Sequence, residues 1–145
     1  METKAQNTTE KTKVFNVIIL DKSGSMSSIR PQAIDGFNET LGGIRAAQLK
    51  YMDTQEHFVS LCTFCGCQLQ MVYDCTPIKE AENLKPEQYT PCCMTPLYDA
   101  IGTTVTKIKK TTQDLADATV LITIITDGLE NASKEWNFSG VMNLI

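Results

Sequence analysis

A short apolar run that stops on an acidic residue is the sequence feature that most constrains the fold. Residues 14–26 read V-F-N-V-I-I-L-D-K-S-G-S-M, with Asp21 directly after the apolar run. A continuous run of this length is typical of a strand buried on both faces, as in the middle of a parallel sheet. Ligands of open α/β sheets bind at the carboxyl ends of the strands, so Asp21, Ser23 and Ser25 are candidate ligands on the following loop.

The chemistry of these three side chains points to a hard cation. One carboxylate and two hydroxyls form a ligand set made only of oxygen, which suits Mg²⁺ and does not suit zinc or copper. We therefore expect Mg²⁺, with Mn²⁺ or Ca²⁺ as alternatives. Each hydroxyl has a second interpretation, because isolated serines commonly cap turns and helix starts.

Composition predicts one ordinary domain. The chain has 145 residues, 42% of them hydrophobic, and a net charge of -4, which gives no electrostatic reason to expect nucleic acid or an anionic membrane as a partner. Residues 1–13 are polar and are expected to be a flexible tail before a domain at 14–145. Without an apolar export or membrane-spanning segment, the expected location is cytoplasmic and the six cysteines are expected to be reduced thiols.

The first half of the chain predicts a helix followed by a hairpin. Ile34, Phe37, Leu41 and Ile44 recur at helical spacing between Pro31 and Tyr51, with Ser28 as the expected cap. Two strand-like segments follow at 57–64 and 68–74. The link between them is too short for a crossover, so they are expected to pair antiparallel, with the second at the edge of the sheet.

The second half predicts one more covered strand. Residues 77–91 read as a short helix and loop, and a helix with the stripe Leu97, Ile101, Val105 and Ile108 is expected from Thr95 to Thr112. A strongly apolar strand at 118–127 is expected beside the first strand, and 133–145 is expected to be helical. The fold class is therefore α/β, with an open, mostly parallel sheet, one antiparallel edge strand and helices on both faces.

Three separated stretches carry a resemblance to a known family. They are D-K-S-G-S at 21–25, M-T-P-L-Y-D at 94–99 and I-T-D-G at 125–128. In this order they resemble the von Willebrand factor A family, in its bacterial form, which holds a metal-ion-dependent adhesion site on a Rossmann-like sheet. The resemblance implies that Ser23 and Ser25 coordinate a metal through their hydroxyls, that Thr95 coordinates it directly or through water, and that Asp21 and Asp127 supply negative charge.

Two departures from that family pattern stand out. Thr95 follows Cys92, Cys93 and Met94, where related bacterial domains often have small residues, and this bulk would change the approach to the metal. A complete domain of the family has six strands, and only four are expected here. The last strands of the family would then be missing. Either the chain is cut short, or a partner or a second copy of the chain covers the outer edge of the fourth strand.

The resemblance implies a protein-binding module rather than an enzyme. The metal would keep one coordination position for an Asp or Glu of a partner protein. A metal-dependent phosphoryl-transfer or hydrolytic enzyme is the alternative, although the sequence has no glycine-rich phosphate loop and carries Ser23 where a catalytic aspartate would be wanted. A scaffold subunit with a vestigial metal site is the third possibility.

Overall fold

A four-stranded open sheet forms the centre of the molecule. The computed structural model describes residues 11–65, 68–91 and 97–126. The strands are β1 (Thr12–Asp21), β2 (Gln55–Cys65), β3 (Gln68–Pro77) and β4 (Ala118–Ile125), in the order β3-β2-β1-β4. β1 pairs parallel with both β2 and β4, and β2 pairs antiparallel with β3. The predicted α/β sheet, its antiparallel edge strand and the position of the fourth strand beside the first are confirmed.

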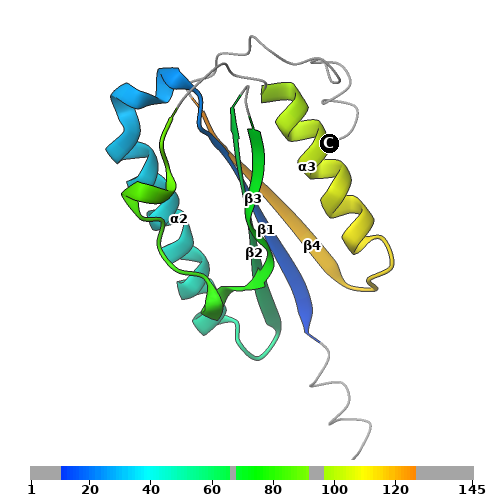
Figure 1. Ribbon diagram of the computed structural model, residues 1–145. Coiled ribbons are helices and arrows are strands. Elements are labelled where there is room, and N and C mark those ends of the chain that lie inside the picture. Colours follow the sequence, from blue (N-terminus) through cyan, green and yellow to red (C-terminus); the bar gives the residue numbers. More distant parts are fainter. Residues whose placement is uncertain (1–10, 66–67, 92–96, 127–145) are drawn as a thin grey trace, which may run out of the picture.

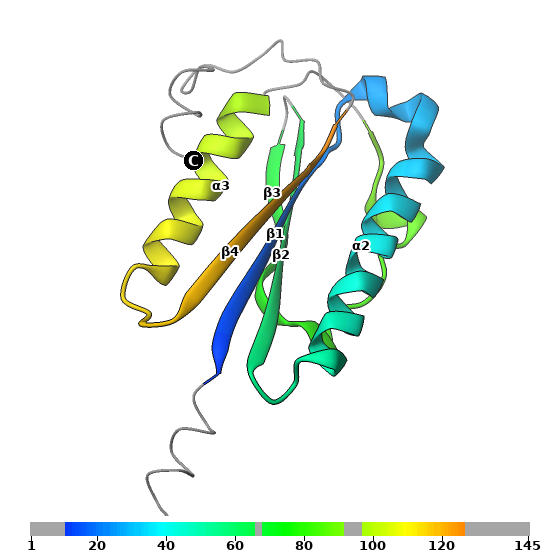
Figure 2. The ribbon, with the colours of Figure 1, turned by 180° about the vertical axis from the view of Figure 1, so that it is seen from behind.

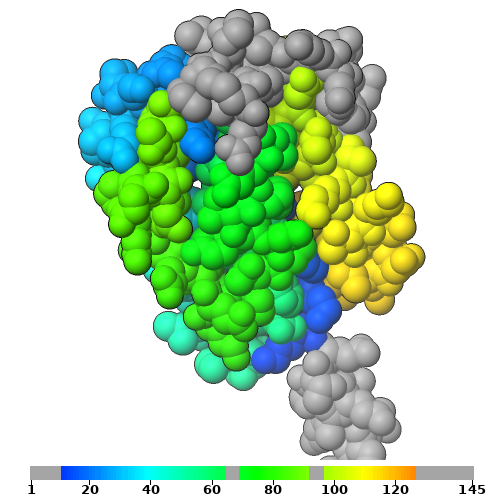
Figure 3. Space-filling model, viewed as in Figure 1, coloured from blue at the N-terminus to red at the C-terminus, as the bar shows by residue number. Residues whose placement is uncertain are grey.

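One long helix covers each face of the sheet. α2 (Arg30–Lys50) lies on one face and α3 (Leu97–Thr112) on the other, as the two opposite views show (Figures 1 and 2). Three 3₁₀ helices complete the described elements: η1 (Gly24–Ile29), with six residues, and η2 (Ile78–Glu80) and η3 (Pro86–Gln88), with three residues each. In the space-filling view, β3 lies at the front between the two helices, and the segment that leads through η3 lies to its left, in front of α2 (Figure 3).

Alternation along β1 divides the core between the two helices. Ile18 and Leu20 belong to the cluster under α2, whereas Val17 and Ile19 belong to the cluster under α3. All four side chains are buried because a central strand has no solvent-facing side. The four stripe residues predicted for each helix are also buried, which confirms both helix assignments: Ile34, Phe37, Leu41 and Ile44 in α2, and Leu97, Ile101, Val105 and Ile108 in α3.

The segment between β3 and α3 is anchored at the three apolar positions expected from the sequence. Ile78, Leu84 and Tyr89 are buried in the cluster under α2. The expected short helix is two isolated 3₁₀ turns, each of three residues.

Two local predictions need correction. Ser28 does not cap α2, because η1 runs directly into that helix and the capping position belongs to Ile29, whose side chain offers no hydrogen bond. β1 begins at Thr12, inside the segment expected to be a tail, because the Thr12 amide donates to the carbonyl of Thr54 at 3.0 Å. The expected strand at 118–127 ends at Ile125, and the expected helix at 133–145 lies outside the described residues.

β4 is an edge strand among the described elements. Its inner edge pairs with β1, and no described strand pairs with its outer edge. Successive side chains of β4 point to opposite faces of the sheet. Val120 and Ile122 pack under α3, whereas Leu121 is 52% exposed. No helix in the described part of the chain is long and apolar enough to cross a membrane.

Candidate metal site

Asp21 ends β1 at the sheet edge where ligands of open α/β sheets bind. Its side chain is fully buried, with 0% of the residue exposed. The amide of Lys22 donates to the carbonyl of Phe64 at 2.7 Å, so the hydrogen bonding between β1 and β2 continues one residue past Asp21. The chain then turns away through η1. The carboxylate therefore sits on a rigid support rather than on a free loop.

Neutral donors hold both oxygens of this carboxylate. The Ser23 amide donates to Asp21 Oδ1 at 2.8 Å, and the Thr126 hydroxyl donates to Asp21 Oδ2 at 2.7 Å. No lysine, arginine or histidine among the described residues forms an ion pair with Asp21. Burying an ionised carboxylate is costly unless an opposite charge or a metal compensates it. Asp21 thus has the surroundings expected of a cation ligand.

The two serine hydroxyls lie at a spacing that suits one shared ion. Ser23 Oγ and Ser25 Oγ are 3.2 Å apart. Two ligands at adjacent corners of a Mg²⁺ octahedron, with bonds of about 2.1 Å, lie about 3.0 Å apart. Ser23 is 1% exposed, whereas Ser25 is exposed to solvent. The three described candidate ligands are therefore all oxygen donors, two of them closely spaced hydroxyls with Ser25 open to solvent, and their chemistry fits a hard cation.

A second segment is tied to Asp21 through its backbone. The buried hydroxyl of Tyr89 donates to the carbonyl oxygen of Asp21. Arg30, at the start of α2, donates from Nε to the carbonyl of Tyr89 at 2.7 Å and from Nη2 to the carbonyl of Pro86. These bonds hold residues 86–89 against the end of β1.

The remaining predicted ligands fall where the structure gives no description. Thr95 and Asp127 lie outside the described residues, so the predicted five-residue site is represented here by Asp21, Ser23 and Ser25. The nearest described residues in sequence are Leu97, where α3 begins, for Thr95, and Thr126, which follows β4, for Asp127. In the views from front and back, the carboxyl ends of β1 and β4 lie side by side, as their parallel register requires (Figures 1 and 2).

Sequence reasoning missed two contributors to this site. Thr126 lies within the I-T-D-G stretch, but only the following aspartate was singled out. Arg30 carried no signal, because its partners are backbone carbonyls 56 and 59 residues away. The signal for Thr126 was its position directly after an apolar strand, level with the acid that ends the neighbouring strand.

The cysteines described here form no metal site. Within the described ranges, no group of three or more His, Cys, Asp and Glu side chains could hold a metal ion. Cys62 and Cys75 are both free thiols. Burial raises the pKa of each thiol, which keeps them protonated and disfavours metal binding.

His57 is a structural residue at the opposite end of the sheet. It pairs with Val14, seven positions before the pairing of Asp21 with Phe64, a separation of about 23 Å along the strand. The Asn16 amide nitrogen lies 3.1 Å from His57 Nδ1 and 3.0 Å from the carbonyl of Phe58, so it donates to both. His57 Nε2 then donates to Gln55 Oε1 at 2.9 Å, which defines a neutral imidazole. Burial also lowers the pKa of His57.

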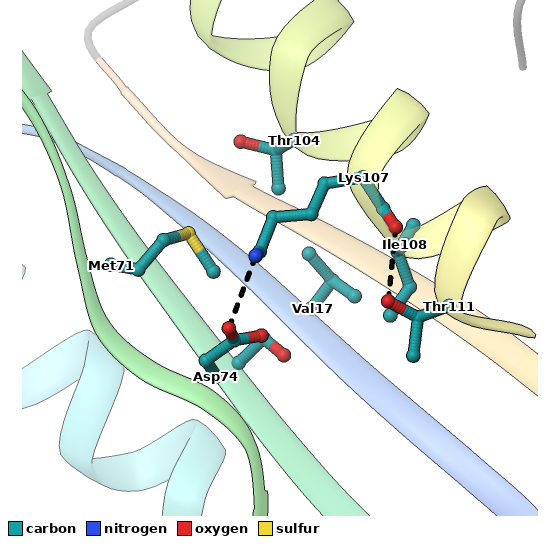
Figure 4. A pocket seen from close by; sticks show the side chains of 8 residues that line it. Val17, Met71, Asp74, Thr104, Lys107, Ile108 and Thr111 are labelled. Atoms are coloured by element: carbon teal, nitrogen blue, oxygen red, sulfur yellow. Dashed lines mark hydrogen bonds and ion pairs between the residues drawn. The ribbon is translucent and has the colours of Figure 1, made fainter.

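Two cavities outside the site lack a comparable set of ligands. One, of about 180 Å³, is lined by Gln48, Glu56, His57, Pro77, Ile78 and Lys79. The other lies between α3 and the sheet (Figure 4) and has about 10 Å³, which is room for roughly one water. Lys107 Nζ approaches Asp74 Oδ2 at 3.1 Å beside this second cavity. We assign no ligand to either.

Comparison with known proteins gives no family assignment. No protein-family model matches the chain, and no curated protein matches it.

Proposed function

We propose that the chain is a non-enzymatic, Mg²⁺-dependent protein-binding module. The observation that carries this proposal is the buried Asp21 carboxylate, which the described residues hold only through neutral donors, together with two serine hydroxyls 3.2 Å apart. The sequence resemblance to the von Willebrand factor A family supports the same interpretation and adds Thr95 and Asp127 as proposed ligands.

The described residues would have different roles in such a site. Ser23 and Ser25 would bind the ion through their hydroxyl oxygens, while Asp21 balances its charge from the buried side. When bound, Mg²⁺ supplies positive charge and a coordination position that a carboxylate can fill. Ser25 is exposed, so a partner's Asp or Glu can approach from its side of the loop. The partner's carboxylate would therefore be the central contact, with the surrounding surface setting specificity.

Two observations favour binding over catalysis. The chain has a single histidine, and it lies about 23 Å along the sheet from Asp21, so it cannot act as a base there. The described ligands that face the ion are hydroxyls, with one carboxylate held by internal hydrogen bonds. This arrangement leaves a bound ion electrophilic toward an external carboxylate.

The test is capture of a partner by the immobilised full chain from native extract, with Mg²⁺ or with EDTA. Capture is expected in Mg²⁺ only, and Asp21→Ala is expected to abolish it. Asp35→Ala is the matched control, because Asp35 is an exposed aspartate on α2. Capture that persists in EDTA and in Asp21→Ala would reject the proposal. Metal-dependent turnover of a generic phosphoester, lost in Asp21→Ala, would favour an enzyme instead.

A further inference from the structure

We propose that Thr126 is a positioning residue, whose hydroxyl fixes the Asp21 carboxylate in the orientation that the metal site needs. This inference rests on the proposed metal site and deepens it. The functional-site prediction from sequence did not include Thr126, and the assignment comes from the contact between the ends of β1 and β4.

The register of the sheet brings the two residues level. Leu20 pairs with Ile125 in the parallel ladder between β1 and β4, so the next residues along the two chains are Asp21 and Thr126. Side chains at paired positions of neighbouring strands point to the same face of a sheet. The Thr126 Oγ1 to Asp21 Oδ2 distance is 2.7 Å, which is a normal length for a hydroxyl that donates to a carboxylate oxygen.

Two donors constrain the carboxylate where one would leave it free to turn. The Ser23 amide holds Oδ1 from within the loop. The terminal torsion of an aspartate has a broad energy profile, so a single bond leaves the second oxygen poorly placed. Thr126, directly after β4, holds Oδ2 from a different part of the chain and thereby fixes this torsion. Each carboxylate oxygen accepts one such bond and keeps a further lone pair for an ion or its bound water.

Partners of this kind around a metal ligand have measurable effects on affinity. Removing an outer hydrogen-bond partner of a ligand typically weakens metal binding about 10- to 100-fold. Valine has nearly the shape of threonine without its hydroxyl, so Thr126→Val removes the bond and keeps the volume. Thr126→Ser keeps the hydroxyl and is the conservative rescue.

The experiment measures the dissociation constant of Mn²⁺, used as the probe ion, by electron paramagnetic resonance on the full chain. Thr126→Val is expected to raise it about 10- to 100-fold, whereas Thr126→Ser stays near the parent value. Thr123→Val is the matched control, because Thr123 lies on β4 and is exposed. Thr126→Ala is a second hydroxyl-free variant, used if Thr126→Val does not fold.

The outcomes separate this inference from the proposed function. A parent chain that binds no Mn²⁺ would overturn the metal site itself. A parent that binds Mn²⁺, with Thr126→Val at the parent affinity, would overturn only the role of Thr126. A lowered melting temperature without a change in Mn²⁺ affinity would assign Thr126 a purely structural role. A Thr126→Ser variant that binds Mn²⁺ as weakly as Thr126→Val would also contradict the inference, because Thr126→Ser keeps the hydroxyl that the inference invokes.

Discussion

Replacing Asp21 with asparagine tests whether the Asp21 carboxylate binds a cation or stabilises the fold by itself. The substitution preserves size and removes the charge. In the parent chain, the carboxylate is fully buried and accepts hydrogen bonds from the Ser23 amide and the Thr126 hydroxyl. Asparagine can accept one of these bonds on its carbonyl, and the Thr126 hydroxyl can rotate to accept from the new amide group. We therefore expect Asp21→Asn to be at least as stable as the parent in EDTA.

In Mg²⁺, the parent should become more stable than Asp21→Asn. At a concentration about 100 times its dissociation constant, an ion that binds only the folded state adds about 2.7 kcal/mol to the free energy of unfolding. For a chain of 145 residues, the unfolding entropy is about 0.3 kcal/mol/K, so the melting temperature should rise by about 9 °C. Asp21→Asn should show almost none of this rise.

The assay is thermal unfolding followed by circular dichroism, for both proteins, across a Mg²⁺ titration and in EDTA. Two results would refute the reasoning. One is a parent melting temperature that does not respond to Mg²⁺. The other is Asp21→Asn that is destabilised by more than about 2 kcal/mol in EDTA, because that loss is typical of a carboxylate needed for its own hydrogen bonds.

Three further predictions test the surrounding structure. His57 has a lowered pKa in the fold, so the unfolded chain binds its proton first, and the free energy of unfolding should fall as the pH drops below about 6.5. Urea unfolding at pH 7.5 and at pH 5 should show a smaller loss of that free energy in His57→Gln than in the parent, and equal losses would contradict this. Tyr89→Phe removes the buried hydroxyl that donates to the carbonyl of Asp21. It should cost about 0.5 to 1.5 kcal/mol in urea unfolding, and an unchanged midpoint would contradict this. Phe37→Ala empties a fully buried position under α2 and should cost about 3 to 5 kcal/mol; a loss below 1 kcal/mol would show that the core can collapse around it.

The fold could be predicted because its strongest signals are local. The apolar run before Asp21 predicts a central strand, and the spacing from Ile34 to Ile44 predicts the buried stripe of α2. Boundaries were less predictable. Ser28 looks like a cap in sequence, but a preceding 3₁₀ turn already continues into the helix, and that turn has no apolar periodicity to reveal it.

The site could be predicted only in part, for a different physical reason. Asp21, Ser23 and Ser25 are close in sequence, so their proximity follows from one loop. Thr126 reaches Asp21 across 105 residues, and this contact depends on which strand lies beside β1 and in which register. Sequence patterns predict that a strand exists more readily than they fix its register, so this contact had to come from the structure.

The most direct test of the account is to locate the ion itself. Crystals of the full chain grown with Mn²⁺ should show one anomalous difference peak at the carboxyl end of β1. The account predicts that this peak lies about 2.0 to 2.3 Å from both Ser23 Oγ and Ser25 Oγ, with Asp21 beside it. A peak at a different place, or no peak while the two serine hydroxyls bond only to each other, would contradict it.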